Sequence, residues 1–61
     1  MIDKKTAFKM TLQQMVDAAE LASAEEMYAM ASEVQRRILK HESQGKAPKK
    51  KLFTALQLLS A

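Results

Sequence analysis

The only glycine and the only proline of this chain lie three residues apart, at Gly45 and Pro48. The residues before them are rich in alanine, methionine, leucine, glutamate, glutamine and lysine, which are strong helix formers. No stretch shows the alternation of β-branched and polar residues that is typical of a strand. The sequence therefore predicts an all-α fold in which residues 45–47 form a linker. Gly45 suits the left-handed position that ends a helix, and Ala47, which precedes the proline, is disfavoured in the α region.

Residues 1–44 are expected to form a helical hairpin of two helices, at about residues 4–21 and 24–43. Asp3 is an acceptable N-cap residue for the first helix. Apolar side chains then recur at the helical period and define a stripe that faces the core. That stripe contains Phe8, Leu12, Met15 and Ala19.

The boundary between these two helices depends on Ser23 and Glu26. Their spacing matches a capping box, in which each side chain hydrogen-bonds the backbone N–H of the other residue. Because the surrounding residues are also strong helix formers, a single continuous helix of about 40 residues is the alternative, and such a helix would need a coiled partner. The capping signal favours the break.

Residues 48–61 are expected to form a short basic amphipathic C-terminal helix. Pro48 suits its first turn. An isolated helix of this size is close to or below the ~12–15 residues at which helices become marginally stable. Its lysines also lie at the positive end of the helix dipole. The helix therefore needs an apolar surface over its leucines, and acidic groups near its lysines would stabilise it.

A chain of 61 residues can bury only a small core, and it has no cysteine for a disulfide or a thiolate metal site. We therefore expect the fold to be completed by homo-oligomerisation or by a partner protein. The chain contains no apolar run long enough to span a bilayer and no signal-peptide core. These features indicate a cytoplasmic protein without membrane contact.

Residue types suited to catalysis or to cofactor binding are sparse. His41 is the only histidine, and no glycine-rich loop is present to hold a phosphate. Asp17 and Glu20 lie three residues apart on a predicted helix, but nothing in the sequence indicates a closed pocket around them. We therefore expect no enzymatic activity, no cofactor and no metal site.

Positive charge is concentrated in the C-terminal segment. Residues 1–45 have a net charge of −1 and residues 46–61 a net charge of +4, which together account for the +3 of the chain. Lysines in such a cluster can neutralise phosphates without reading a base sequence. A small nucleic-acid-binding regulator is therefore the alternative function, and its contacts would be Lys46, Lys49, Lys50 and Lys51.

A helix-turn-helix motif is a weaker nucleic-acid hypothesis. The segment TLQQMVDAAELASAEEMYAMASEVQRRIL resembles such a motif superficially. However, Glu20 occupies the turn position usually given to glycine. Glu25 and Glu26 would open the recognition helix and face the phosphates of DNA, which they would repel.

The chain has more apolar side chains than two helices can bury against each other. Its five methionines add adaptable contact surface. We therefore predict a small helical regulator that binds and inhibits or sequesters a partner protein through helical contacts. A homo-oligomerisation module is a further alternative. The predicted partner-binding residues are Leu52, Phe53, Leu56, Leu59, Tyr28 and Leu39, with the four lysines as electrostatic contacts.

The start MIDKKTAF, the segment AEEMYAM and the leucine-rich tail belong to a very small, cysteine-free helical chain. In size and organisation it is similar to small prophage antirepressors of the Gifsy type. The similarity covers the general layout of the whole chain, so no functional residue is carried over. It implies a phage repressor as the partner and transcription regulation as the role. The repressor would leave its operator DNA through helical protein contacts, without this protein touching the DNA.

Overall fold

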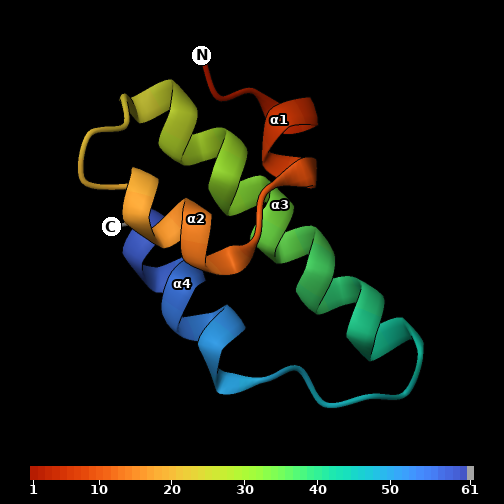
Figure 1. The fold of residues 1–61 in the computed structure, drawn as a ribbon. Coiled ribbons are helices and arrows are strands. Elements are labelled where there is room, and N and C mark those ends of the chain that lie inside the picture. Colours follow the sequence, from red (N-terminus) through yellow and green to blue (C-terminus); the bar gives the residue numbers. More distant parts are fainter. Residues whose placement is uncertain (61) are drawn as a thin grey trace.

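The computed structural model describes residues 1–60, which form four helices and no strand. The predicted all-α fold is confirmed. No helix within residues 1–60 has both the length and the apolar composition needed to cross a membrane. The helices are α1 (Lys4–Lys9), α2 (Leu12–Ala18), α3 (Ala24–Ser43) and α4 (Lys50–Ser60) (Figure 1).

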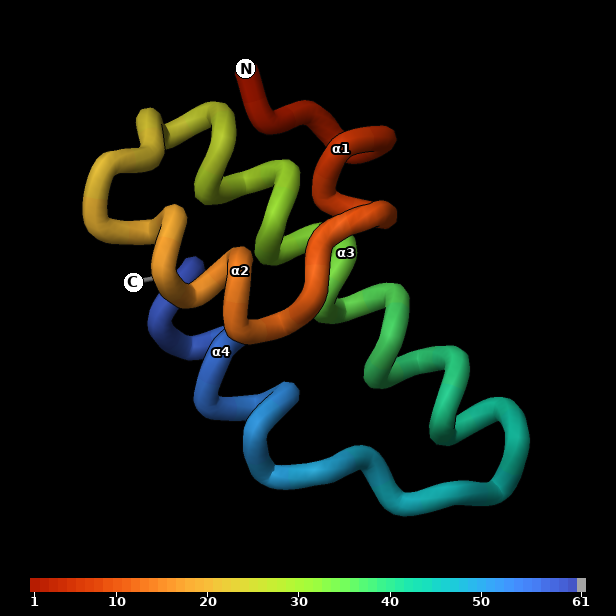
Figure 2. Tube along the Cα trace, in the orientation of Figure 1, coloured from red at the N-terminus to blue at the C-terminus, as the bar shows by residue number. Residues whose placement is uncertain are grey.

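α3 is the longest helix, and the other helices are arranged around it. α4 runs back along α3 in the antiparallel direction, α1 packs against α3, and α2 packs against α4 (Figures 1 and 2). Side chains from all four helices meet in a single core. Its buried members are Ala7, Met15, Met30, Val34, Ile38, Leu52, Ala55 and Leu59.

The prediction of one helix over residues 4–21 is wrong. The chain turns at Met10, whose backbone is extended with ψ 147°, and α2 begins after Thr11. Thr11 and Gln14 form a capping box. The backbone N–H of Gln14 donates to Thr11 Oγ1 at 3.1 Å, and the backbone N–H of Thr11 donates to Gln14 Oε1 at 2.9 Å. The sequence T-L-Q-Q carries this start signal, but the apolar periodicity continues across it and predicts an unbroken helix.

A buried carboxylate with two partly exposed arginines lies at the corner between α1 and α2. Glu33, which is only 5% exposed, binds Arg36 at 2.9 Å and Arg37 at 2.6 Å. Arg37 Nη2 also donates to the backbone carbonyl of Met10 at 2.6 Å and lies 3.4 Å from two carbonyls of α1. The last carbonyls of a helix lack donors within that helix. Arg37 therefore supplies a donor to the end of α1 from 27 residues further along the chain.

The predicted start of the second helix is confirmed. The backbone N–H of Glu26 donates to Ser23 Oγ at 3.2 Å, and the backbone N–H of Ser23 donates to Glu26 Oε1 at 2.9 Å. The second oxygen of Glu26 accepts the backbone N–H of Ile2 at 2.8 Å, which ties the N-terminal segment to α3. The alternative of one continuous helix is excluded, because residues 19–23 leave the helix before this cap.

Gly45 ends α3 as predicted. Its φ of +72° is in the left-handed region that favours glycine. The N–H of Lys46 donates to the carbonyl of His41 at 2.9 Å, and the N–H of Gly45 donates to the carbonyl of Glu42 at 3.0 Å. These two bonds define a Schellman motif. The linker that follows is longer than predicted, because α4 begins at Lys50 rather than at residue 48. The predicted last residue of the helix, at position 61, lies outside the described residues.

Two of the leucines predicted to contact a partner are buried by the chain itself. Leu52 is 8% exposed and Leu59 is 3% exposed, and both belong to the core. The prediction that they need a second polypeptide is wrong. The bend after α1 places α2 against α4. α2 and α3 together therefore cover the apolar side of α4, whereas the two helices of a simple hairpin would bury their apolar faces against each other.

Three carboxyl groups have a lowered pKa because hydrogen bonds stabilise their charged form. The ordinary pKa is 3.8 for the aspartate and 4.5 for the glutamates. The donors that lower the pKa are the backbone N–H of Thr6 for Asp3, the backbone N–H groups of Ser23 and then Ile2 for Glu26, and the guanidinium groups of Arg36 and then Arg37 for Glu33.

We expect the protein to lose stability in acid. Because the folded pKa of each of these carboxyls lies below its ordinary value, their contribution is complete above the ordinary values and is lost as the pH falls through the folded ones. The unfolding temperature should be flat above about pH 5.5 and decline below about pH 4.5. Thermal unfolding followed by circular dichroism over this range measures the effect. A flat or rising profile in acid would contradict it.

Candidate protein-binding surface

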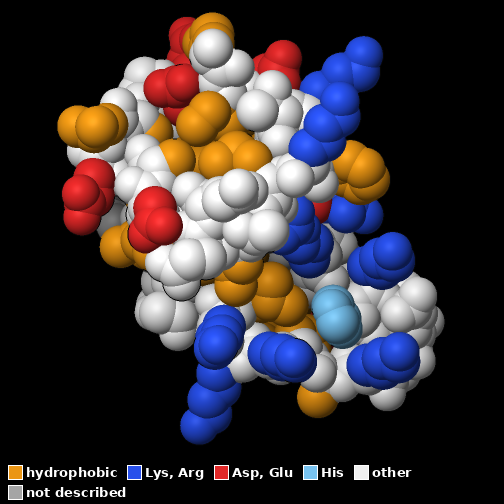
Figure 3. Space-filling view, viewed as in Figure 1, with side chains coloured by type: hydrophobic (Ala, Val, Ile, Leu, Met, Phe, Trp, Pro, Cys, Tyr) orange, Lys and Arg blue, Asp and Glu red, His pale blue; other side chains and the backbone are white. Residues whose placement is uncertain are grey.

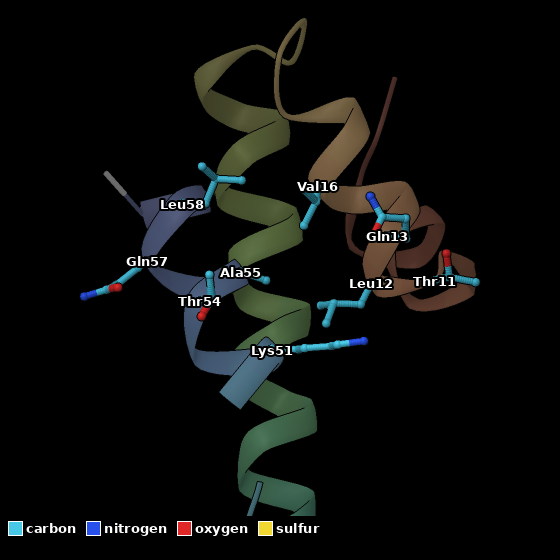
Figure 4. A pocket seen from close by; sticks show the side chains of 9 residues that line it. All are labelled: Thr11, Leu12, Gln13, Val16, Lys51, Thr54, Ala55, Gln57 and Leu58. Atoms are coloured by element: carbon cyan, nitrogen blue, oxygen red, sulfur yellow. The ribbon is translucent and has the colours of Figure 1, made fainter. Parts of the chain in front are cut away.

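A groove of about 810 Å³ lies between α2 and α4. Figure 4 shows Leu12 and Val16 on α2 and Ala55 on α4 pointing into the space between the two helices. The groove is therefore apolar along its length and has a polar rim. Its full lining is Thr11, Leu12, Gln13, Val16, Lys51, Thr54, Ala55, Gln57 and Leu58.

A second depression, of about 530 Å³, lies on the outer face of α4. It shares Thr54 and Gln57 with the groove, so the two hollows adjoin each other on either side of these residues. We call their combined lining the α4 surface. Beyond the first turn of α4, residues 52–60 include no charged residue, which is unusual for a helix face in contact with water. The large apolar residues of the α4 surface are Leu12, Val16, Phe53, Leu56 and Leu58.

A third hollow, of about 350 Å³, connects α4 to α3. It is lined in part by Ser60, which also lines the depression on α4, and by Tyr28 on α3. Tyr28 and Leu39 are both exposed and are separated by eleven residues, which is the spacing of one helix face. We call this face, which comprises Tyr28, Ser32, Gln35 and Leu39, the outer stripe of α3. Its aromatic end is bordered by α1, since Lys4 Nζ lies 5.5 Å from the centre of the Tyr28 ring.

The α4 surface has lysines at one end, and carboxylates of α2 and the turn after it lie beyond its other end. Lys50 and Lys51 line its hollows at the start of α4, and no carboxylate lines either hollow. At the other end of the groove, Gln13 Nε2 donates to Asp17 Oδ1 at 3.0 Å, and Glu20 follows the end of α2. In the view of Figure 3, Lys and Arg side chains surround the end formed by the linker and the start of α4 and also lie at the upper right, and most of the visible carboxylates lie at the top and left.

The structure separates the predicted partner-binding residues into two groups. Phe53 is exposed and Leu56 is half-buried, and both lie on the α4 surface. Tyr28 and Leu39 lie on the outer stripe of α3. Leu52 and Leu59 are buried in the core and therefore do not belong to the candidate site. Sequence reasoning missed three members of the α4 surface, because periodicity places the first on the stripe that faces the core, the second at the edge of that stripe and the third off the main stripe of its helix. These are Leu12, Val16 and Leu58.

The four predicted lysines belong to the segment that follows the end of α3, where the backbone N–H of Lys46 donates to the carbonyl of His41 at 2.9 Å. Lys46 and Lys49 belong to the linker, and Lys50 and Lys51 begin α4. A hollow of about 410 Å³ at this end of the molecule is lined by α3 residues and by the leucine that follows the lysines. Its lining is Arg36, Arg37, Lys40, His41, Gln44 and Leu52.

The first turn of α3 is unsuited to reading DNA. It contains Glu25 and Glu26, and the carboxylate of Glu26 is engaged by two backbone N–H groups of its own chain. Two negative charges at this position repel phosphates. The helix-turn-helix hypothesis gains no support from this geometry.

Residues 1–60 contain no group of three or more histidine, cysteine, aspartate or glutamate side chains placed to hold a metal ion. No protein-family model, curated protein or solved structure matches the chain. The candidate site is therefore defined by the geometry of its own residues. That geometry consists of a largely apolar surface around α4 with Lys50 and Lys51 at one end, an exposed stripe on α3 and a basic end.

Proposed function

We propose that this protein is a small non-enzymatic regulator that binds other polypeptides through the α4 surface and the outer stripe of α3. One observation carries the proposal. Phe53, Leu58, Tyr28 and Leu39 are each at least 46% exposed in a chain whose core is already closed. Large apolar side chains gathered on adjoining faces are characteristic of protein interaction sites.

The form of the two faces supports helical contacts. The outer stripe of α3 has the i, i+4, i+7, i+11 spacing by which one helix packs along another. Tyr28 and Phe53 add aromatic side chains, which are enriched at the energetic centres of interfaces. The partner is therefore expected to offer an apolar helix or a groove.

A DNA-binding repressor is the partner that we propose for the outer stripe of α3. The support for this choice is the resemblance to prophage antirepressors. In this mechanism the protein occupies a surface of the repressor that DNA binding requires, and it makes no DNA contact of its own. Sequestration by protein contacts needs neither a cofactor nor a catalytic group.

We expect Leu39→Lys to raise the dissociation constant for the protein partner at least about tenfold, because a charge would replace an exposed apolar contact. The full chain is purified from its own host with its retained partners and weighed by native mass spectrometry. Leu21→Lys is the matched control, since Leu21 is 95% exposed and lies on neither face. If the partner is a repressor, the wild-type protein releases it from operator DNA in a mobility-shift assay and Leu39→Lys does not. Equal retention by both variants would contradict the proposed contact.

Nucleic-acid binding by the basic end is the second candidate function. The observation in its favour is that α3 adds Arg36, Arg37 and Lys40 around a hollow whose lining includes Leu52, the residue that follows the lysine cluster. Replacing the four lysines with glutamine distinguishes the two functions. If this end binds DNA, the change weakens duplex binding. It also makes the slope of log binding constant against log salt concentration less steep, by up to roughly 0.9 per lysine. If the protein acts as proposed, the lysine variant still retains the partner that binds the outer stripe of α3, which contains none of the four lysines.

A further inference from the structure

We propose that the α4 surface is covered by a second copy of this chain, with the two α4 helices antiparallel about a two-fold axis. This proposal rests on the proposed function in one respect, namely that the α4 surface binds protein. It assigns the α4 surface to self-association and leaves the outer stripe of α3 to the other partner.

The first argument is the chemistry of the exposed side of α4. Phe53 and Leu58 are exposed on either side of Thr54 and Gln57, and this part of the helix has no charge. An interface core is depleted in charged residues and enriched in aromatic ones. The residues at the centre of the face are uncharged, so a second helix packed there would bury no ionised group.

The second argument is charge complementarity. The α4 surface has Lys50 and Lys51 at one end, and Asp17 and Glu20 lie outside its lining, at the end of α2 and in the turn that follows, beyond its other end. A two-fold axis across the middle of α4 places the lysines of each copy over the carboxylates of the other. A symmetric contact of this kind must be complementary to itself, and this surface meets that condition.

The third argument is the helix dipole of α4. Its first turn contains lysines and no acidic residue, which is the unfavourable arrangement for the positive end of a helix. Carboxylates from a second copy would offset this charge at both ends of the dimer. A parallel arrangement would instead place lysines against lysines. A foreign acidic helix would complement the lysine end of the surface and be repelled at the carboxylate end.

The experiment is sedimentation equilibrium of the purified full chain, without any other protein, from roughly micromolar to roughly millimolar concentration. We expect a species of twice the 6.9 kDa chain mass. Leu58→Lys should raise the dissociation constant at least about 30-fold, and Leu21→Lys should leave it unchanged. Both positions are exposed, and circular dichroism verifies that both variants are folded.

Charge reversal tests the antiparallel arrangement directly. A Lys50→Glu, Lys51→Glu variant and an Asp17→Lys, Glu20→Lys variant should each self-associate more weakly than wild type, because like charges then meet at both ends. Mixed together, the two variants should form a heterodimer, since every end then meets its opposite. This rescue should weaken as salt is added.

Three results would overturn the inference. One is a monomer mass at the highest concentration, and another is a dimer that Leu58→Lys leaves intact. The third is that the two charge variants form no heterodimer on mixing. The α4 surface would then bind a foreign partner, or two copies would associate in another arrangement. Partner retention by the outer stripe of α3 is measured separately, through Leu39→Lys. The dimer and the proposed function can therefore fail independently.

Discussion

We expect the Leu59→Ala variant to lose about 2–4 kcal/mol of unfolding free energy, and the Leu58→Ala variant to lose less than about 1 kcal/mol. The two leucines are adjacent on α4 but differ in environment. Leu59 is 3% exposed within the core, and Leu58 is 47% exposed at the groove. Truncating the buried side chain removes many apolar contacts and leaves a cavity, whereas truncating the half-exposed one removes fewer contacts and leaves no closed cavity.

Urea denaturation at low protein concentration measures this difference without a contribution from self-association. A single small domain rarely has more than about 3–5 kcal/mol of stability, so Leu59→Ala should be largely unfolded at physiological temperature. Equal losses for the two variants would mean that the chain does not bury Leu59, and that the C-terminal leucines need an external cover after all.

This prediction also limits how the function can be tested. Deleting residues 48–61 would remove Leu52, Ala55 and Leu59 from the core. The remaining chain would be expected to unfold, and its loss of partner binding would carry no information about the contact. Point changes at exposed positions of α4 and α3 avoid this problem, because they leave the core side chains in place.

The Arg37→Met variant is expected to lose about 2–4 kcal/mol, and the Arg36→Met variant less than about 1 kcal/mol. Both arginines bind Glu33, at 2.6 Å and 2.9 Å respectively. The Arg36 side chain is 47% exposed and lies over the Phe8 ring, so water can replace much of its interaction. Arg37 is more buried and also donates to the carbonyl of Met10. Methionine keeps the apolar stem of either side chain and removes the charge.

Thermal and urea denaturation of the two variants provide the comparison. Hydrogen exchange adds a local measure, because the amides of α1 should lose protection in Arg37→Met before the whole molecule unfolds. If the two variants have the same stability, the contacts from Arg37 to the end of α1 do not hold the corner. The break between α1 and α2 would then depend on the Thr11 capping box alone.

The ends of α3 could be predicted from the sequence because they depend on local hydrogen bonds. Ser23 and Glu26 cap the helix across three residues, and Gly45 ends it by a backbone conformation that glycine adopts without strain. The all-α class follows from composition in the same way. The Thr11 capping box is equally local and was readable, but the apolar period running through it predicted a continuous helix.

Which side chains are covered was decided only by the tertiary structure. Periodicity places Leu52, Ala55 and Leu59 on one side of α4, but it does not say what lies against that side. The corner after Met10 depends on Arg37, 27 residues away, and it brings α2 onto α4. The groove at that contact joins residues about forty positions apart in the chain. A local pattern records which face of a helix is apolar, whereas its burial depends on long-range contacts that only the folded chain creates.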